Sequence, residues 1–583
     1  MSARTDNNDA NPPEAALKRD LERQLRAQLA TVTGGLAPDD YMQAWWDWYF
    51  NLTKQPDKQL ALVQSAFQKA LDTWQFAASA ATGLPAPAEQ QVPGFGDPAW
   101  NVWPFNVYAK SYVTWAAWLQ EAVAAGSMGP DRSAARLRFA TQQVLDAASP
   151  ANFLHTNPEL LNKTVAESGQ NLVRGLKNWL EDAERMLSGK RSRLAQFEVG
   201  KDVAVTPGKV IFRNRLIEVL QYSPQTDSVY AEPVLITPAW IMKYYILDLS
   251  PRNSLVRYLV EKGHTVFMIS WKNPTSVERD LGMDDYVQLG FKDALEAVNR
   301  IVPERKVHAV GYCIGGTLLS VAAALLGARA DQRLASVSLL AALTDFSEPG
   351  ELSVFISPSQ LAMLEAVMSK AGVLESERMG AAFMLLRSKD LLWTPAVNSY
   401  LRGERARPND LMAWNQDGTR MPWRMHTEYL ERLYLKNELA RGQFTVGGER
   451  VDLKSLRVPM FVVGTETDHV APWRSVFKLR GLTRSADYTF LLTSGGHNAG
   501  IVSGPVHPKR RHRVLGWTND TDSLTPDEWL RAAPCQPDSW WPAWQRWLAE
   551  RSDPRRQPPP LTGTARTGTQ PELEDAPGRY VRE

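Results

Sequence analysis

Cysteine and histidine are scarce in this chain of 583 residues. It holds two cysteines, Cys313 and Cys535, and eight histidines. Two cysteines cannot build the disulfide framework of a small secreted domain, so a reducing compartment suits the chain. No close group of cysteines and histidines indicates a metal site, and no glycine fingerprint indicates a nucleotide or nicotinamide cofactor. We therefore expect neither a metal nor a cofactor.

The chain also lacks a large excess of positive or negative charge, and it lacks long uninterrupted apolar runs. The 66 Lys and Arg residues nearly balance 64 Asp and Glu, for a net charge of +2, which argues against a nucleic-acid binder. The first 20 residues hold no apolar segment, so we expect no signal peptide and a cytoplasmic protein. The longest apolar run, 307–327, is interrupted by Gly311, Gly315 and Gly316. It predicts a buried strand, a tight turn and a buried helix rather than a transmembrane segment.

The periodicity of apolar residues divides the chain. Residues 1–15 read as a disordered arm, and three- and four-residue spacing in QAWWDWYFNL and NLVRGLKNWLEDAERML predicts a helical N-terminal domain over 16–200. Apolar strands alternate with helices over 201–552, which indicates a mostly parallel sheet covered on both faces. The strand signal fades over 346–445, so we expect a mainly helical cap inserted there. The Pro-rich tail, 553–583, is expected to be extended.

Tryptophan is abundant, with 21 residues. One interpretation is aromatic filling of the core. The other is an exposed aromatic surface that contacts an apolar material, because such patches mark interaction sites. Composition alone leaves both open.

The segment GYCIGG, residues 311–316, lies between the predicted strand KVHAV and the predicted helix TLLSVAAALLGA. A Gly-x-Cys-x-Gly box between a strand and a helix is typical of the nucleophile elbow of α/β-hydrolases. The glycines allow a sharp turn in which side chains would clash. Cys313 would then stand at a helix N-terminus, where the helix dipole favours a thiolate. This predicts an α/β-hydrolase core with Cys313 as nucleophile, against the common alternative of a buried, inert cysteine.

The nucleophile needs a base and an acid. His497 lies in the glycine loop SGGHNAG, after what reads as the last strand, where this fold places its imidazole. Asp468 follows an apolar strand in VVGTETDHVAPW, with Glu466 as its nearest rival. The order Cys313, Asp468, His497 is the α/β-hydrolase order of nucleophile, acid and histidine.

The oxyanion of the reaction would be bound by backbone N–H groups. One is that of Ile314, directly after the nucleophile, and the second is expected from Trp240 or Ile241 in the loop after PVLIT.

Several longer stretches appear in one fixed order. They are NFLHTNPELL, VTPGKVIFRN, YYILDLSPRNSLVRYLVEKGHTVFMISWKNP, GYCIGGTL, DHVAPW, WTND, SWWPAW and APGRYV. With them the chain resembles class I polyhydroxyalkanoate synthases from about residue 95 to its end. The resemblance implies polymerisation of (R)-3-hydroxyacyl-CoA with release of CoA, and GYCIGG resembles the short-chain enzymes that use 3-hydroxybutyryl-CoA. Cys313 would carry the growing acyl chain, with Asp468 and His497 as its partners.

The family also implies a homodimer and association with polyester granules in the cytoplasm, through the helical N-terminal domain. A cysteine is suited to such chemistry because exchange of one thioester for another keeps the acyl group activated. Two alternatives stay open: a cysteine-dependent acyl-CoA thioesterase or ester hydrolase, and a non-catalytic granule-associated protein.

A basic run follows His497. Lys509, Arg510, Arg511 and Arg513 are candidates for contacts with the CoA phosphates, the alternative being a solvated loop. The family commonly has Ser-Gly-His-Ile-Ala-Gly where this chain has SGGHNAG, and this difference concerns the mouth of the site.

Overall fold

The computed structural model describes residues 36–82, 94–127, 132–188, 196–505, 507, 509–517, 524–561 and 574–583, together with 22, 24–28 and 30. The expected disordered arm, 1–15, lies outside these residues. The chain forms two compact units. One comprises 29–192 and 380–407, and the other comprises 1–28, 193–379 and 408–583. We call them the helical unit and the sheet unit.

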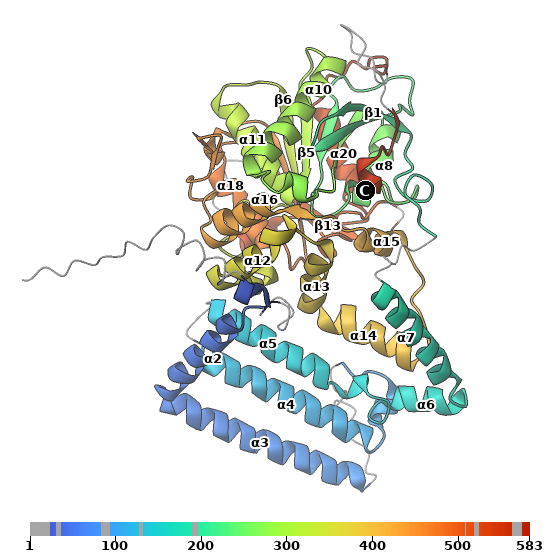
Figure 1. Ribbon diagram of the computed structural model, residues 1–583, viewed down its shortest axis with the longest axis vertical. Helices are drawn as coiled ribbons and strands as arrows, with labels where there is room; N and C mark the ends of the chain where they lie inside the picture. The colour runs from blue at the N-terminus through green and yellow to red at the C-terminus, as the bar shows by residue number, and fades with distance from the viewer. Residues whose placement is uncertain are drawn as a thin grey trace, which may run out of the picture. The chain divides into compact units, whose positions relative to one another are not determined.

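The helical unit is built from amphipathic helices. Helices α3, α4 and α5 run side by side, and α2 packs on α5 (Figure 1). Proline opens α2, α3 and α6 in the first turn, where its missing N–H costs no hydrogen bond. The helices are α2 (Pro38–Thr53), α3 (Pro56–Ala81), η1 (Pro98–Asn101), α4 (Phe105–Ala125), α5 (Arg132–Ala148), η2 (Pro150–Asn152), α6 (Pro158–Ala166) and α7 (Gln170–Ser188).

Part of the segment expected as a cap belongs to the helical unit instead. Residues 380–407 hold the end of α13 (Ser376–Leu386), then η7 (Lys389–Trp393), α14 (Thr394–Ala396) and η8 (Val397–Leu401). A Cβ atom on Gly175 of α7 would lie 1.8 Å from the carbonyl oxygen of Tyr400, so the two backbones touch. Asn171 donates to the carbonyl of Leu401 over 2.8 Å. The cap was predicted from the local spacing of apolar residues over 346–445. That spacing does not show which distant helix a segment packs against.

The sheet unit centres on one sheet of eleven strands, in the order β14-β13-β12-β11-β6-β5-β3-β4-β2-β1-β15. The six strands from β12 to β4 are parallel, and the strands at both edges pair antiparallel. The strands are β1 (Gly208–Arg213), β2 (Ile217–Tyr222), β3 (Val234–Thr237), β4 (Val266–Trp271), β5 (Val307–Tyr312), β6 (Leu334–Leu340), β11 (Met460–Thr465), β12 (Tyr488–Thr493), β13 (Arg511–Gly516), β14 (Cys535–Pro537) and β15 (Glu574–Asp575).

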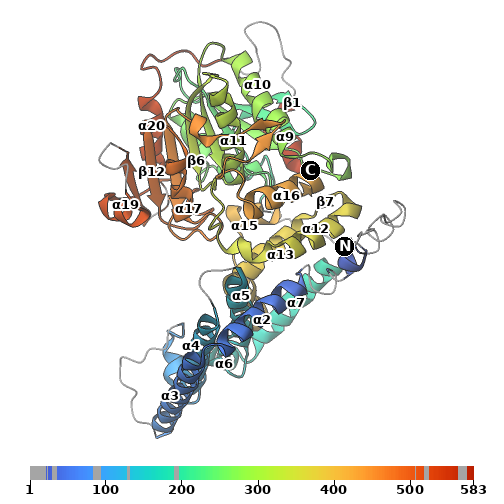
Figure 2. The ribbon, with the colours of Figure 1, turned by 90° about the vertical axis from the view of Figure 1, so that its left-hand side faces the viewer.

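Helices cover both faces of this sheet, as the sequence predicted (Figure 2). Two short antiparallel strand pairs, β7 (Val373–Leu374) with β8 (Met421–Pro422) and β9 (Thr445–Val446) with β10 (Glu449–Arg450), lie outside it. The α-helices are α8 (Leu255–Glu261), α9 (Met283–Asp285), α10 (Asp293–Ile301), α11 (Ile314–Ala328), α12 (Pro358–Ala371), α15 (Asp410–Gln416), α16 (Trp423–Glu428), α17 (Trp473–Phe477), α18 (Leu479–Leu482), α19 (Pro526–Ala532) and α20 (Trp541–Glu550). The π-helices are η5 (Tyr286–Lys292) and η9 (Tyr429–Leu435), and the 3₁₀ helices are η3 (Tyr244–Leu247), η4 (Ser276–Glu278), η6 (Glu351–Phe355), η10 (Leu453–Ser455) and η12 (Tyr580–Arg582).

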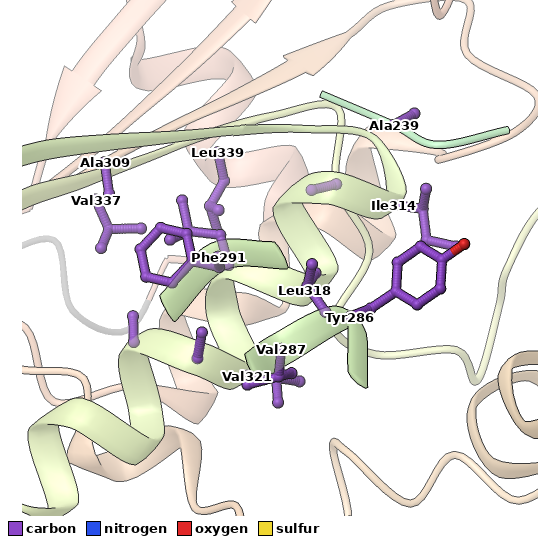
Figure 3. Close-up of a cluster of buried hydrophobic side chains, with 14 of the residues drawn as sticks. Ala239, Tyr286, Val287, Phe291, Ala309, Ile314, Leu318, Val321, Val337 and Leu339 are labelled. Atoms are coloured by element: carbon purple, nitrogen blue, oxygen red, sulfur yellow. The ribbon is translucent and has the colours of Figure 1, made fainter. Parts of the chain in front are cut away.

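Each face of the sheet carries its own apolar core. On one face α10, α11 and η5 pack against β5 and β6, and on the other α8 and α20 close the core. The first core is drawn in Figure 3, where side chains of η5 approach those of α11: Tyr286, Val287 and Phe291 beside Ile314, Leu318 and Val321. The long apolar run thus resolves into β5 and α11, both buried. Among the described residues no helix is long and apolar enough to span a membrane.

Three expectations about the end of the chain need correction. The strand before His497, β12, is not the last, because β13 and β14 extend the sheet beyond it. Arg511 and Arg513 therefore lie in a strand and not in a loop. Residues 574–583 are not a loose extended tail: β15 pairs with β1, and Tyr580 and Val581 are buried. Residues 562–573 lie outside the described part.

The tight packing of the elbow yields a stability prediction. A Cβ atom on Gly315 would lie 2.4 Å from the carbonyl oxygens of Thr237 and Pro238, and backbone cannot give way as a flexible side chain can. Gly315→Ala should therefore lower the free energy of unfolding by about 1–3 kcal/mol. Gly481→Ala is the matched control, because nothing lies within 4 Å of its Cβ position. Urea unfolding measures both, and equal stability of the two variants would contradict the packing argument.

Candidate active site

Cys313 stands between β5 and α11 in a strained backbone conformation. Its φ and ψ are 54° and −129°, a combination that non-glycine residues rarely adopt. Its N–H donates to the carbonyl of Leu340 over 2.9 Å, and its carbonyl accepts from the N–H of Gly316 over 2.9 Å. The thiol is partly exposed. Strain of this kind is kept where the surrounding structure holds a side chain in a functional position, and here that side chain is the predicted nucleophile.

Asp468 and His497 come together across the ends of two neighbouring parallel strands. Asp468 follows β11 and His497 follows β12, and Nδ1 of His497 lies 2.8 Å from Oδ2 of Asp468. The side chain of Asp468 is fully buried, and that of His497 is 10% exposed. With Nδ1 bonded to the carboxylate, Nε2 is the nitrogen left for a reacting group.

The carboxylate of Asp468 is saturated with hydrogen bonds. Its Oδ1 accepts from the N–H groups of Val470 and Ala471, over 2.9 and 2.8 Å. Its Oδ2 accepts from the hydroxyl of Thr465 over 2.9 Å, besides the imidazole. Burial alone would raise the pKa of Asp468, but the charge of His497 and these hydrogen bonds hold it below its ordinary value. The group is an ionised carboxylate fixed in one orientation.

The charge state of His497 follows from the same contacts. Burial lowers the pKa of an imidazole, but the charges of Asp468 and Cys313, with hydrogen bonds to both, raise the pKa of His497 well above 6.5. The thiol of Cys313 thus lies close enough to the imidazole to influence its charge.

The alternatives to these residues have other partners. Glu466 pairs with Arg511, at 2.7 Å, and not with the imidazole. His308 lies on β5 with hydrogen bonds to the hydroxyls of Ser336 and Ser552, over 2.7 and 3.1 Å. His264 stacks on Tyr230. Of these acids and imidazoles, the structure brings Asp468 and His497 to Cys313.

The buried histidines predict a loss of stability in acid. Burial, with the charge of Arg551, lowers the pKa of His308 to about 4, and burial lowers that of His426 to about 4. Between about pH 6.5 and 4 the unfolded chain binds these protons and the folded chain does not, so the free energy of unfolding falls as pH falls. Urea titrations across this range should show it, with a smaller slope for His308→Gln. The exposed His155 gives the control, His155→Gln, whose slope should stay that of the wild type.

Tyr312 and Asn498, which the sequence did not identify as site residues, lie beside the imidazole. The ring of Tyr312 stacks on that of His497 with centroids 5.7 Å apart, and its hydroxyl donates to Oδ1 of Asn498 over 2.6 Å. Both flank residues that the sequence did identify. Only the fold shows that they bond to each other across 186 positions.

Two tyrosines of η9 also face this region. Burial is the main cause that raises the pKa of Tyr429 and Tyr434. The charges of neighbouring groups, Cys313 among them, raise it further. Their hydroxyl oxygens lie 3.5 Å apart. They lie within the range 346–445 that was expected as a cap, and no sequence signal connected them with the elbow.

The loop expected to complete the oxyanion site runs beside the elbow. β3 pairs with β5, and the close approach of Gly315 to Thr237 and Pro238 brings this loop against the start of α11. The carbonyl of Trp240 accepts from the hydroxyl of Thr419 over 2.5 Å, and that of Ile241 accepts from the N–H of Thr419. The N–H of Ile314 opens α11, where backbone donors have no partner within the helix. The assignment of these donors stays a prediction.

The basic run divides into two pairs. Arg511 binds Glu466, and Arg513 donates to the carbonyl of Ala533 over 2.7 Å. Arg510 lies beside the histidine loop, where a Cβ on Gly495 would be 3.0 Å from its Nη1. Neither Lys509 nor Arg510 forms an ion pair with a residue that the structure describes. In the described ranges no group of three or more histidine, cysteine or acidic side chains could hold a metal ion.

Comparison with known proteins identifies the family of the chain. Residues 232–503 match the model of the alpha/beta hydrolase fold, and 16–58 and 93–259 match two models of the poly-beta-hydroxybutyrate polymerase N-terminus. The chain is 39% identical over 541 residues to the poly(3-hydroxyalkanoate) polymerase of Methylorubrum extorquens, covering 91% of this chain and 87% of that protein. The chain belongs to the poly(3-hydroxyalkanoate) polymerase family.

Two further relatives in this polymerase family match over a similar length. Poly(3-hydroxyalkanoate) polymerase subunit PhaC of Rhizobium meliloti (strain 1021) is 37% identical, covering 92% of this chain and 87% of that protein. The corresponding subunit of Cupriavidus necator is 38% identical, covering 90% and 88%. The hydrolase-fold match spans Cys313, Asp468 and His497, so the candidate site lies wholly within the family's hydrolase region.

Proposed function

We propose that this chain polymerises (R)-3-hydroxyacyl-CoA, with 3-hydroxybutyryl-CoA as the preferred substrate, and releases CoA through an acyl-Cys313 intermediate. The observation that carries the proposal is a strained cysteine at the elbow, close to a hydrogen-bonded His497–Asp468 pair, in a member of the polymerase family. A non-catalytic granule protein would have no use for a buried, fully bonded carboxylate aligned with an imidazole and a thiol.

The first half-reaction loads the enzyme. The thiolate of Cys313 attacks the thioester carbonyl, and the oxyanion formed is bound by the N–H of Ile314 and an N–H of Trp240 or Ile241. Collapse of the tetrahedral species breaks the bond to the CoA sulfur, and the His497 imidazolium supplies the proton for the leaving thiolate. One thioester replaces another, so the acyl group stays activated for transfer.

The second half-reaction extends the chain. The 3-hydroxyl of a hydroxyacyl group attacks the acyl thioester, and its proton passes to Nε2 of neutral His497. As the new ester bond forms, the bond between the acyl carbon and the Cys313 sulfur breaks, and the cysteine leaves as a thiolate beside the imidazolium. Asp468 acts through the imidazole, because its four hydrogen-bond donors already occupy both carboxylate oxygens. His497 is therefore the base in this proposal, and Asp468 orients it and stabilises its charge.

The CoA phosphates need cations near the mouth of the site. We assign this role to Lys509 and Arg510, since Arg511 and Arg513 are held by Glu466 and the Ala533 carbonyl. A guanidinium and an ammonium bind phosphate oxygens by charge-assisted hydrogen bonds. The same chemistry explains why the run lies directly after the histidine loop.

The helical unit is proposed to contact the polyester granule and a second copy of the chain. Most tryptophans of the sheet unit are buried, including those of α20. The tryptophans that are exposed lie on the helical unit. On α2, Trp45 stacks on Tyr49 and Trp46 on Phe50, and all four rings are exposed. Exposed aromatic faces of this kind mark interaction with apolar surfaces. Both interpretations of the tryptophan content thus apply, each to one unit.

The test is to incubate the purified chain with (R)-3-hydroxybutyryl-CoA, to follow free CoA with a thiol reagent and to size the product. We expect CoA release together with polyester of high mass. CoA release with only free 3-hydroxybutyrate would instead make the chain a thioesterase. Absence of release with this and longer hydroxyacyl-CoA substrates would overturn the enzymatic proposal.

A further inference from the structure

Residues 574–583 of the sheet unit are bound to β1 and β2, the first two strands of the sheet unit in the chain, by several hydrogen bonds. β15 pairs with β1, and the N–H of Tyr580 donates to Oε2 of Glu218 over 3.1 Å. The hydroxyl of Tyr580 donates to the carbonyl of Asn214 over 2.7 Å. The side chain of Glu218 is fully buried. The segment is thus built into the core of the unit.

The same segment binds a buried lysine that follows the proposed oxyanion loop. Lys243 is 3% exposed, and its ammonium donates to the main-chain oxygens of Tyr580 and Glu583, over 3.2 and 2.9 Å. Asn273 also donates to the main-chain oxygen of Glu583, over 3.3 Å, and the side-chain carboxylate of Glu583 interacts with the charge of Lys243. A buried ammonium is retained only where it has hydrogen-bond acceptors or an opposite charge, so residues 580–583 fix the position of its side chain.

The backbone of Lys243 is fixed as well. Its carbonyl accepts from Nε1 of Trp414 over 2.8 Å, and the preceding residues Trp240 and Ile241 are bonded to Thr419. At the other end of the loop, Nε1 of Trp271 donates to the carbonyl of Pro238 over 2.9 Å. The loop 238–243 is therefore clamped at both ends, and Lys243 is its connection to residues 580–583.

We propose that Lys243 is a positioning residue of the acyl-transfer site, which couples residues 580–583 to the loop whose N–H groups bind the oxyanion. This inference rests on the proposed function. An oxyanion donor contributes mainly in the transition state, so a displaced loop lowers kcat and leaves substrate binding nearly unchanged. Cys313 and His497 are carried by other elements, the β5–α11 turn and the histidine loop, so we expect a change at Lys243 to leave the thiol and the imidazole in place.

The primary test compares Lys243→Met with Lys243→Arg and Lys209→Met. Lys209 binds the same segment through Asp575, at 2.9 Å, but is not connected to the loop, so Lys209→Met is the matched control. We expect Lys243→Met to lower kcat for CoA release by about 10- to 100-fold with KM changed by less than about threefold. Lys243→Arg should recover part of kcat, and Lys209→Met should retain the wild-type value.

Two measurements without substrate separate this inference from the proposed function. Alkylation of Cys313 by iodoacetamide forms no oxyanion, and its rate should stay within about twofold of wild type in Lys243→Met. Hydrogen exchange of the 239–242 amides should become faster, while the β12 amides keep their protection. Unchanged exchange in the loop, or a fall in alkylation that parallels the fall in kcat, would overturn the positioning role. Should Lys243→Met fail to fold, removal of residues 581–583 gives the second variant, with the same expected exchange.

Discussion

Cys313→Ala should lower CoA release from hydroxyacyl-CoA by about 10⁴-fold or more, because no other group in the elbow can form the acyl-enzyme. The thiol lies at a strained position with the imidazole as its partner, and alanine keeps the backbone without supplying a nucleophile. Stopped assays of CoA release and gel sizing of the product measure the effect. Mass spectrometry of the intact wild-type chain should show the added acyl group, and the alanine variant should show none.

The second cysteine provides the control for this experiment. Cys535 is exposed on β14, at the edge of the sheet, and takes no part in the proposed chemistry. Cys535→Ala should therefore keep wild-type turnover and acyl loading, and both variants should unfold at the wild-type temperature. Full activity in Cys313→Ala, or loss of loading in Cys535→Ala, would remove the assignment of the nucleophile.

Asp468→Asn should lower turnover by about 10²- to 10⁴-fold, with the fold kept. The carboxylate of Asp468 raises the pKa of His497, and an amide cannot supply that charge. With the pKa of His497 lowered, the imidazolium beside Cys313 is lost at a lower pH. Alkylation of Cys313 at pH 7 should slow, and the pH profile of alkylation should differ from that of the wild type.

The neighbouring acid serves as the control for Asp468. Glu466 lies on the same loop but pairs with Arg511 of β13, so Glu466→Gln should keep turnover within about threefold and an unchanged alkylation profile. A profile that moves equally in both variants would show that the loop as a whole, and not the Asp468 carboxylate, sets the charge of His497.

The sequence predicted the parts of this molecule that are local. GYCIGG predicts its own turn because glycine is required where backbone meets backbone, and the structure shows such contacts at Gly311 and Gly315. Continuous apolar strands predicted a parallel sheet because both of its faces are buried. The pairing of Asp468 with His497 was also predictable, since the ends of neighbouring parallel strands meet at one edge.

What could not be predicted depends on contacts between distant segments. Nothing near Tyr400 shows that it packs on Gly175 of α7, so 380–407 was placed in the cap. The hydrogen bond between the hydroxyl of Tyr312 and the side-chain oxygen of Asn498 forms because the fold brings the two side chains together. The sequence around either residue does not indicate its partner. Lys243 reads as an ordinary surface lysine, because the main-chain oxygens to which it donates belong to Tyr580 and Glu583, more than 330 residues away. Main-chain acceptors carry no sequence signature.

The pairing of β15 with β1 also has a consequence for the nascent chain. β1 leaves the ribosome some 360 residues before β15 exists, and at about 5–20 residues per second the interval is on the order of 20–70 s. For that time the outer edge of β1 is an open strand edge that can pair with another chain. During the same interval Lys243 cannot form its hydrogen bonds to the main-chain oxygens of Tyr580 and Glu583. The contacts that hold Lys243 in the proposed polymerase site therefore form only after residues 574–583 have been made, later than the helical unit.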